Sequence, residues 1–543
     1  ENGTLAEKGV GKMNDFDESV LRRIHDFGVT HLWYTGVIRH ATCTDYSSFG
    51  IPCQNPRVVK GRAGSPYAIT DYYDIDPDIA VNVDERMAEF EALISRTHDE
   101  GLKMIIDFVP NHVARQYKSI AKPQGVSDLG EDDDLGKHFD PQNNFYYCPN
   151  EPLDTSAIPR SINNEATKPD YKSAEYTETV ARCTGNDRFD AHPQANDWYE
   201  TIKLNYGIDY CDWGGRSNHF NPIPDTWHKM TDILLFWAAK GIDGFRCDMA
   251  EMVPHEFWKY ATEKVKAQYP HIVFIGEVYD PNQYRTYIAA GFDYLYDKVG
   301  MYDCLRDVMC EHRSANDITR QWQATDDIGK HVLYFLENHD EQRIASNFFC
   351  GNMQKGIPAL IVAALFQCNP IMIYAGQEFG EKGMDGEGFS GIDGRSTIFD
   401  YWSIDAIRKG FFERSKLSAE QVQLEKEYRK ILTFCNSEKA ISNGKTFDLM
   451  YANETNDAFD SNKQFAFLRS SNNTTLLIVA NFSKTEAHIR VNIPAHAFDY
   501  MEIKEGKKNM VDLLSGNHQS VVLQKDSSIE IVVPALNGRV YKF

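Results

Sequence analysis

Apolar runs and amphipathic stretches alternate through most of the chain. The stretches at 85–101 and 256–268 carry apolar residues at helical spacing, and short apolar runs lie on either side of each. Strands that alternate with helices imply βα units and a parallel sheet. Eight such units close into a (β/α)8 TIM barrel, an α/β fold whose chemistry lies where the strands meet the following loops. The apolar runs are at 28–37, 101–109, 241–248, 271–278, 331–338 and 369–376.

Two regions break this alternation. More than a hundred residues separate the runs at 101–109 and 241–248, far beyond an ordinary βα loop of about 2–6 residues. Residues 113–225 are therefore expected to form a separate, inserted lobe. After about residue 436 the pattern changes to short alternating strands, which predicts an antiparallel β-sandwich over 436–543. The barrel then comprises residues 1–112 and 226–435.

Several acidic side chains stand where apolar, strand-like runs end. Arg246 and Asp248 share one face of a strand because strand side chains alternate. A guanidinium beside Asp248 should keep it ionised, as a nucleophile requires. Glu277 lies where its apolar stretch ends, and partial burial should raise its pKa, which suits a proton donor. The segments concerned are DFVPNH (107–112), GFRCDMAE (244–251), GEVY (276–279) and FLENHD (335–340).

Two of these segments bring an acid and a histidine together, Asp340 with His339 and Asp107 with His112. Retaining cleavage of a glycoside needs a nucleophilic carboxylate and a second carboxyl, about 5 Å away, that acts first as acid and then as base. The chain supplies both, with Asp340 in addition. We interpret Asp107 as structural first, because a buried aspartate bonded to backbone or to Arg246 explains it equally well.

In these four segments, and in their order, the chain resembles glycoside hydrolase family 13, the α-amylase family, with some features of neopullulanases and cyclomaltodextrinases. The resemblance implies that Asp248 is the nucleophile, Glu277 the acid/base and Asp340 a third carboxylate that binds sugar hydroxyls. It also implies that the lobe is the family's domain B, inserted after the third barrel strand, and that the C-terminal sandwich is domain C. The groups that it places around the reacting sugar are Arg246, His112 and His339.

Two further residues are candidate sugar contacts. Tyr67 falls where the family stacks an aromatic ring on the sugar, although simple packing would also explain it. Arg395 follows the predicted eighth strand, where the family often presents an arginine to distal glucose units, and a salt bridge within its loop is the alternative. His112 alone would more often be a structural histidine, but its place beside Asn111 favours a sugar contact.

The resemblance also implies a first barrel strand upstream of residues 9–24. Only a few polar residues precede that segment here. We expect residues before Glu1 to supply this strand, and the alternative is a barrel that closes differently.

Many α-amylases bind calcium, and the resemblance places Asn111 at one of the ligand positions. Lys203 stands where those enzymes carry an aspartate, and Met252 where they have a histidine that supplies a backbone oxygen. An ammonium group cannot ligate calcium and would repel it. We therefore expect no required cofactor and no metal at this site, with Lys203 taking the place of the cation. The Lys-Leu-Asn triplet at 203–205 is more like neopullulanases, so the preference among α-glucans stays open.

Charge and composition limit the partners. The chain has 543 residues, a net charge of −22 and a sequence pI of about 5.2, which argues against nucleic acid or an anionic membrane because both attract basic patches. No apolar run approaches the roughly 20 residues of a membrane-spanning helix. The eleven cysteines lack a CxxC motif, which speaks against a zinc site or a complete disulfide framework. Cys43 and Cys53 bracket a short loop and could pair.

The predicted function is retaining hydrolysis of α-1,4 or α-1,6 glucosidic bonds in starch-like α-glucans or maltooligosaccharides, through a covalent glucosyl-enzyme intermediate. One alternative is a transglycosylase or a sucrose- or trehalose-active relative. Another is a noncatalytic glycan-binding protein on the same fold, which would typically lack one of the carboxylates. From the habits of the family we expect an exported bacterial protein, periplasmic or extracellular.

Overall fold

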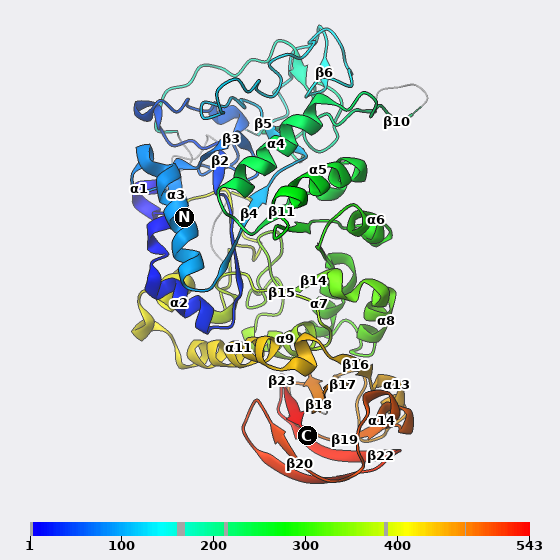
Figure 1. Ribbon diagram of the computed structural model, residues 1–543. Helices are drawn as coiled ribbons and strands as arrows, with labels where there is room; N and C mark the ends of the chain where they lie inside the picture. The colour runs from blue at the N-terminus through cyan, green and yellow to red at the C-terminus, as the bar shows by residue number, and fades with distance from the viewer. Residues whose placement is uncertain (1–3, 160–168, 211–214, 385–388, 473) are drawn as a thin grey trace.

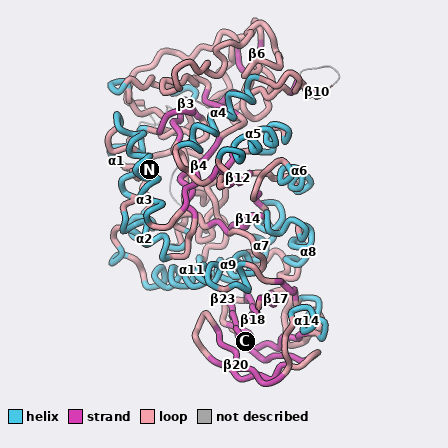
Figure 2. The backbone as a smooth tube through the Cα atoms, viewed as in Figure 1, coloured by secondary structure: helices cyan, strands magenta, loops and turns pink. Residues whose placement is uncertain are grey.

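The computed structural model describes residues 4–159, 169–210, 215–384, 389–472 and 474–543. A barrel sheet with its helices occupies the middle of the molecule, a loop-rich lobe lies at one end, and the C-terminal strands lie at the other (Figure 1). Figure 2 shows how little regular structure the lobe contains compared with the other two parts.

Seven parallel strands form the barrel sheet. Their side chains are largely buried because helices cover the outer face and side chains fill the inner one. The predicted α/β barrel is confirmed, and each predicted apolar run contains one of these strands. In sheet order the strands are β1 (His31–Tyr34), β4 (Lys103–Phe108), β11 (Gly244–Cys247), β12 (Val273–Gly276), β13 (Tyr294–Tyr296), β14 (Val332–Phe335) and β15 (Ile371–Met372).

Two features of the sheet differ from a closed barrel of eight predicted strands. β13 lies outside the predicted runs, because a segment as short as YLY shows no distinct apolar pattern. Within the described residues no strand joins β15 to β1, so the sheet is open between these two edges. The opening is where the first strand of the resembled family would lie.

The C-terminal domain is built from antiparallel strands. Alternate residues of its strands point into a core, as Ile529, Ile531 and Val533 do. In sheet order, six strands form one sheet: β16 (Lys445–Asp448), β17 (Gln464–Ser471), β18 (Thr474–Asn481), β23 (Asn537–Lys542), β20 (Gly506–Asp512) and β21 (His518–Leu523). Two more, β19 (Ala487–Ile493) and β22 (Ser527–Val533), pair with each other. The C-terminal all-β prediction is confirmed.

Helices pack around the barrel sheet (Figure 1). The main ones are α2 (Glu18–Asp26), α3 (Arg86–Asp99), α4 (Asp225–Ala239), α5 (His255–Gln268), α6 (Tyr284–Ala289), α7 (Asp303–Met309), α8 (Asp317–Ala324), α9 (Gly356–Leu365), α10 (Asp405–Phe411) and α11 (Ala419–Ser437). Every residue of α9 is buried, and its sequence GIPALIVAAL is apolar on all sides, as suits a helix enclosed by other elements. It contacts α11, β18 and β23, so it joins the barrel to the C-terminal domain.

The lobe lies between β4 and β11 in sequence, and its described residues form only short strand pairs. β5 (His112–Ala114) pairs with β8 (Thr201–Lys203), and β6 (Tyr147–Cys148) pairs with β7 (Ala181–Arg182). Pairs of this length bury little apolar surface. Side-chain contacts between loops must therefore hold the lobe together.

The structure tests two predictions, a Cys43–Cys53 disulfide and the absence of a membrane-spanning helix. The Cys43 thiol lies 3.9 Å from the Gly61 carbonyl oxygen and that of Cys53 lies 3.3 Å from Asp45 Oδ1, and both cysteines are free. The suggested Cys43–Cys53 pairing is wrong, because each thiol contacts an oxygen atom and both cysteines are free. None of the described helices is long and apolar enough to cross a membrane.

A buried ion pair fixes the loop that follows β14. Arg343 Nη1 donates to Glu337 Oε2 at 2.8 Å, while the other nitrogens of Arg343 donate to Ser396 Oγ and the Ala375 carbonyl at 2.9 and 3.0 Å. The second oxygen of Glu337 accepts from the Ile344 backbone N–H at 2.7 Å. Both side chains are almost completely buried. The pair therefore ties the ends of β14 and β15 to the loop near residue 395.

Replacing Arg343 with methionine should destabilise the protein by about 3–5 kcal/mol, because Glu337 would stay buried without its cation. Thermal and denaturant unfolding would measure the change. The control is Arg320→Met, since the Arg320 side chain is 83% exposed and its loss should cost no more than about 0.5 kcal/mol. Equal stability of the two variants would show that the buried pair does not hold this loop.

Candidate active site

The carboxyl ends of β4, β11, β12 and β14 bring the predicted acidic residues to one edge of the sheet. In the parallel register Arg246 lies beside Asp107, and Cys247 beside Gly276. The ladder continues one residue further, because the Asp248 N–H donates to the Phe108 carbonyl at 2.9 Å and the Glu277 N–H to the Cys247 carbonyl at 3.1 Å. Asp248 and Glu277 are thus held by backbone hydrogen bonds as the strands end.

Arg246 lies between the carboxylates. Its Nη1 donates to Asp248 Oδ1 at 2.7 Å, and its Nη2 forms an ion pair with Glu277 Oε2 at 2.9 Å. Asp107 Oδ1 lies further from Nη1, at 3.8 Å, and Asp107 also accepts from the Gly36 N–H at 3.3 Å. One buried guanidinium therefore faces three acids. The aromatic rings around it are those of Trp33, Tyr67 and Tyr296, at 5.0, 5.5 and 5.4 Å.

The charge on Asp248 differs from the sequence prediction. Burial and the nearby charge of Glu277 raise the pKa of Asp248 to about 8, although Arg246 acts in the opposite direction. One cation cannot fully compensate several carboxylates that water does not reach. Near neutral pH the pair Asp248–Glu277 therefore retains a proton in the substrate-free protein.

Glu277 is held by its own set of donors. The Met249 N–H donates to Glu277 Oε2 at 2.9 Å, and the Tyr279 hydroxyl donates to Oε1. Met249 adopts a left-handed backbone conformation, with φ of 43°, which is unusual for a residue with a side chain and typical of functional sites. Glu251 accepts from the Tyr279 N–H at 3.0 Å and so fixes the loop that carries this tyrosine.

Sequence reasoning did not identify Tyr279 as a functional residue. The available signal was its position two residues after Glu277 in GEVY, where an extended chain places both side chains on one side. The hydroxyl contact makes Tyr279 a positioning residue for Glu277.

Asp340, His339 and Tyr67 form a second group beside the first. His339 Nε2 lies 3.1 Å from Asp340 Oδ2 and 3.0 Å from the Tyr67 hydroxyl oxygen, and the Tyr67 ring stacks on the imidazole at 5.3 Å. Burial would raise the pKa of Asp340, but the ion pair with His339 outweighs it and lowers that pKa to about 2. The Asp340 side chain is 45% exposed, whereas those of Asp248 and Glu277 are 9% and 3% exposed. Asp340 thus marks the open side of the site.

His112 is neutral, and its tautomer follows from its neighbours. Burial, and then the charge of Lys203, lower the pKa of His112 to about 3. Asn111 Oδ1 accepts from the Lys203 ammonium, so its amide nitrogen is the donor to His112 Nδ1, at 3.1 Å. The ring proton must then be on Nε2, and a hydrogen bond to the Tyr67 backbone acts against the lowering of the pKa of His112.

The Lys203 ammonium lies between the two residues at which the family resemblance implies calcium ligands. Its Nζ contacts Asn111 Oδ1, lies 3.3 Å from the Met252 carbonyl oxygen and forms a 2.7 Å ion pair with Asp187. Asn111 and Met252 supply the two oxygens that the resemblance assigned to calcium. A fixed positive charge between them does not fit a divalent cation.

Arg395 is engaged within its own loop. It forms a forked ion pair with Asp393 Oδ2, at 2.8 and 2.5 Å, and its side chain is 44% exposed. Arg395 therefore forms the salt bridge within its loop that was the alternative to a sugar contact. The charge of Arg395 still helps to lower the pKa of Asp340.

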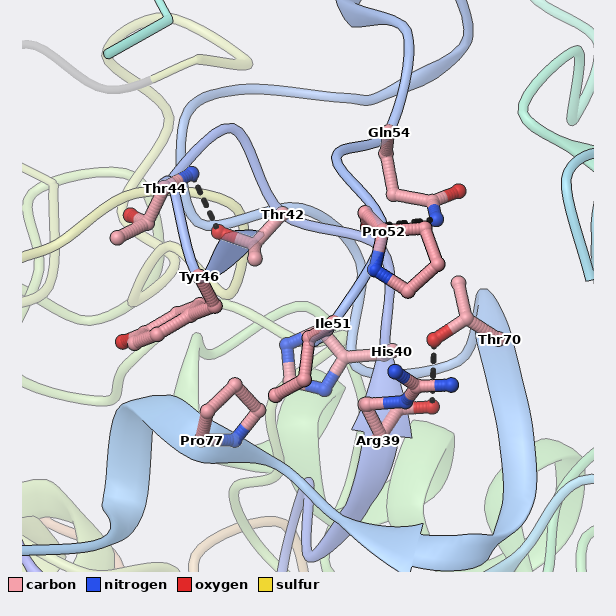
Figure 3. A pocket seen from close by; sticks show the side chains of 10 residues that line it. All are labelled: Arg39, His40, Thr42, Thr44, Tyr46, Ile51, Pro52, Gln54, Thr70 and Pro77. Carbon is pink, nitrogen blue, oxygen red and sulfur yellow. Dashed lines mark hydrogen bonds between the residues drawn. The ribbon is translucent and has the colours of Figure 1, made fainter. Parts of the chain in front are cut away.

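A small cavity lies away from the three carboxylates, near the pair β2 (Ile38–His40) and β3 (Ile69–Ile75) (Figure 3). Its volume of about 10 Å³ would hold roughly one water molecule. It is therefore too small for a sugar. The residues that line it are Arg39, His40, Thr42, Thr44, Tyr46, Ile51, Pro52, Gln54, Thr70 and Pro77.

The chain is similar to known proteins over most of its length. Residues 7–183 and 221–471 match the family model described as the alpha amylase catalytic domain, and residues 456–543 match the alpha amylase C-terminal all-beta domain. The chain is 23% identical over 486 residues to Alpha-amylase 3 of Dictyoglomus thermophilum, which covers 84% of this chain and 82% of that protein. It is 20% identical over 466 residues to a cyclomaltodextrinase of Geobacillus thermopakistaniensis, which covers 84% of this chain but only 62% of that enzyme.

A solved structure shows the same fold. The crystal structure of a noncanonic maltogenic alpha-amylase, AmyB from Thermotoga neapolitana, has a TM-score of 0.62 to this chain and covers 98% of this chain and 95% of that one. The sequence identity is 19%, so this likeness speaks to the fold alone.

Proposed function

The chain belongs to the alpha-amylase family, and on that premise we propose that it is a retaining glycoside hydrolase of starch-like α-glucans and maltooligosaccharides. The observation that carries the proposal is the position of Arg246, which contacts both Asp248 and Glu277. Two carboxyl groups on one guanidinium favour the short separation of retaining enzymes, about 5 Å. They disfavour the wider gap of about 6.5–9.5 Å that holds a water molecule in inverting enzymes.

The reaction follows from the proton that the two carboxyl groups retain. When substrate binds, that proton must be on Glu277, which donates it to the glycosidic oxygen while Asp248 attacks the anomeric carbon. The bond to the leaving sugar breaks and a covalent β-glucosyl ester forms on Asp248. Glu277, now ionised, accepts a proton from water, and the resulting attack releases the sugar with its α configuration.

The remaining groups act on the sugar without entering the covalent chemistry. Asp340 is ionised and exposed toward the open side, so it can accept hydrogen bonds from two sugar hydroxyls. The Tyr67–His339 stack offers the sugar an apolar face, and His112, which is hydrogen-bonded to the Tyr67 backbone, stays a predicted sugar contact. Charges that are already in place stabilise the oxocarbenium-like transition state without reorganising.

The bond type and the competing activities are part of the same proposal. The cleaved bonds are α-1,4 or α-1,6, since the relatives include an alpha-amylase and a cyclomaltodextrinase. A transglycosylase or a sucrose- or trehalose-active enzyme would use the same intermediate. A noncatalytic glycan-binding protein is disfavoured because all three carboxylates are present and grouped. Chromatography of products from soluble starch, pullulan, cyclodextrin and sucrose separates these activities.

We further propose that Lys203 replaces the structural calcium of many relatives. Its ammonium bonds the amide of Asn111 on the barrel side and the carboxylate of Asp187 in the lobe. The lobe is thereby fixed against His112 through an ammonium group that belongs to the chain rather than through an exchangeable ion.

Removing each carboxylate should give a different product in the presence of azide. With α-maltosyl fluoride, whose leaving group needs no acid, Glu277→Ala should still form the ester on Asp248, and azide should give the α-glycosyl azide. Asp248→Ala should instead let azide replace the nucleophile and give the β-glycosyl azide. Both variants should lose about 10²–10⁴-fold or more in starch hydrolysis, and Glu263→Ala on the exposed face of α5 should lose none. The opposite azide products would reverse the two assignments.

Activity should fall as the pH rises through about 8. The raised pKa of Asp248 means that the pair keeps its proton below that pH and loses it above. Without the proton, Glu277 cannot act as the acid. The pH profile of kcat/KM on a maltooligosaccharide measures this limb, and a flat profile up to pH 10 would be inconsistent with it.

Calcium should leave the natural protein unchanged. Adding calcium should alter neither its melting temperature nor its activity, because Lys203 already occupies the site. Lys203→Met should cost about 1–3 kcal/mol through loss of the buried contacts, Lys203→Asp should respond to added calcium, and the exposed control Lys264→Met should do neither. A rise in the melting temperature of the natural protein on adding calcium would contradict the proposal.

A further inference from the structure

Three metal-ligating side chains meet in the lobe, away from the carboxylates. They are His138, Cys148 at the end of β6 and Cys183 directly after β7. The ligand atoms all lie within 4.8 Å of one another, and the two sulfurs are 3.9 Å apart. We propose that these residues bind a zinc ion that holds the lobe in its folded form, a role that does not depend on the proposed glycosidase activity.

The spacing of the sulfurs suits a metal rather than a disulfide. Two thiolates on a tetrahedral zinc ion, each about 2.3 Å from the metal, lie roughly 3.8 Å apart. A disulfide requires about 2.05 Å. The observed 3.9 Å is close to this zinc spacing and far from the disulfide length. The Cys310–Cys350 thiols lie at a similar 3.7 Å, so it is the third ligand, His138, that distinguishes the lobe cluster.

The strand register explains why the two thiols stop short of a bond. Cys148 lies opposite Ala181, and the Cys183 N–H donates to the Tyr146 carbonyl, so the two cysteines are diagonal neighbours on one face of the pair. Diagonal Cα atoms are roughly 7–8 Å apart, beyond the usual disulfide limit of about 6.8 Å. A metal ion between the sulfurs bridges this gap.

The third ligand comes from a neighbouring segment that the backbone holds in place. The Tyr147 N–H donates to the His138 carbonyl at 3.3 Å, so His138 lies alongside β6. Two thiolates and an imidazole are the ligand types that zinc prefers, and three protein ligands leave a fourth position for water. Cys148 and Cys183 are 4% and 0% exposed.

The lobe is a part of the molecule that such an ion would stabilise strongly. Its paired strands β6 and β7 have two residues each. Among the described residues, the apolar core around Cys148 and Cys183 has five buried side chains, with four partly buried ones packed against them. A structural zinc ion supplies folding free energy directly, which small cores otherwise lack.

The segment that follows Cys183 also contacts residues at the active-site edge. The Cys183 carbonyl accepts from the Lys203 N–H at 2.9 Å, and two residues further on the Gly185 carbonyl accepts from the Asn111 amide at 2.8 Å. Asp187 then pairs with Lys203. A metal at Cys183 would therefore fix the segment that positions Asn111, and through it His112.

The first test uses the natural protein with Co²⁺ as the probe. The full chain is freed of metal with a chelator, reduced, and titrated with Co²⁺ alone. An intense thiolate-to-cobalt charge-transfer band, with the visible bands of tetrahedral Co²⁺, saturating at about one ion per chain, is the expected result. Absence of these bands would overturn the proposal, as would a Cys148–Cys183 disulfide found by mass spectrometry of the unreduced, alkylated protein.

The second test identifies the ligands. Cys148→Ser and Cys183→Ser should each lower the bound zinc of the purified protein tenfold or more and remove the charge-transfer band. Cys310→Ser is the matched control, because its thiol lies 3.7 Å from that of Cys350 and, among the described residues, no third ligand joins them. Full zinc content in the two lobe variants, or loss of zinc in the control, would refute the assignment. Should the lobe variants fail to fold, the cobalt titration of the natural protein decides alone.

Discussion

A single buried cation, Arg246, is the interaction on which the active-site edge depends. Three acids converge on it from the ends of three adjacent parallel strands, and burial makes each of them costly. The guanidinium has two terminal nitrogens in a fixed plane, so it can face Asp248 and Glu277 at once. The guanidinium group reduces the repulsion between Asp248 and Glu277, and its fixed geometry also sets how close their carboxyl groups lie. Electrostatic compensation and catalytic geometry are therefore one feature of the molecule.

Arg246 compensates the negative charge of the carboxylates only in part, and the retained proton is the one that the proposed acid catalysis uses. One positive charge against several carboxylates leaves a proton that the pair retains to about pH 8. The pKa of Asp340 is lowered instead, because the neighbouring His339 supplies a second positive charge. Neighbouring acids are thus driven to different protonation states by different partners, as paired carboxyl enzymes require.

In the lobe, too, charged groups stabilise a region that has little packed apolar core. It has little regular structure, and polar anchors hold it to the barrel: Lys203 bonds Asn111 and Asp187. In our proposals a lysine stands where relatives have calcium, and a zinc ion lies where a larger core would otherwise be needed. Both anchors bear on His112, so the order of the lobe and the shape of the site are linked.

Much of the fold could be predicted from the sequence because the buried strands are continuous apolar runs, and the acids that follow them share one edge by the geometry of parallel sheets. The short strand β13 has no such run. The raised pKa of Asp248 depends on how many acids share one cation, which sequence spacing does not reveal. Tyr279 and the cluster of His138, Cys148 and Cys183 became visible only when separate segments were placed together in space.

The most direct measurement is to identify the atom that becomes bonded to sugar. A maltosyl fluoride with a second fluorine at C5 of the reacting ring slows the release of the intermediate, so the labelled protein can be digested and the modified peptide sequenced by mass spectrometry. We predict one sugar per chain, attached to Asp248. A label on Glu277, or steady turnover without any labelled peptide, would contradict a covalent mechanism organised around Arg246.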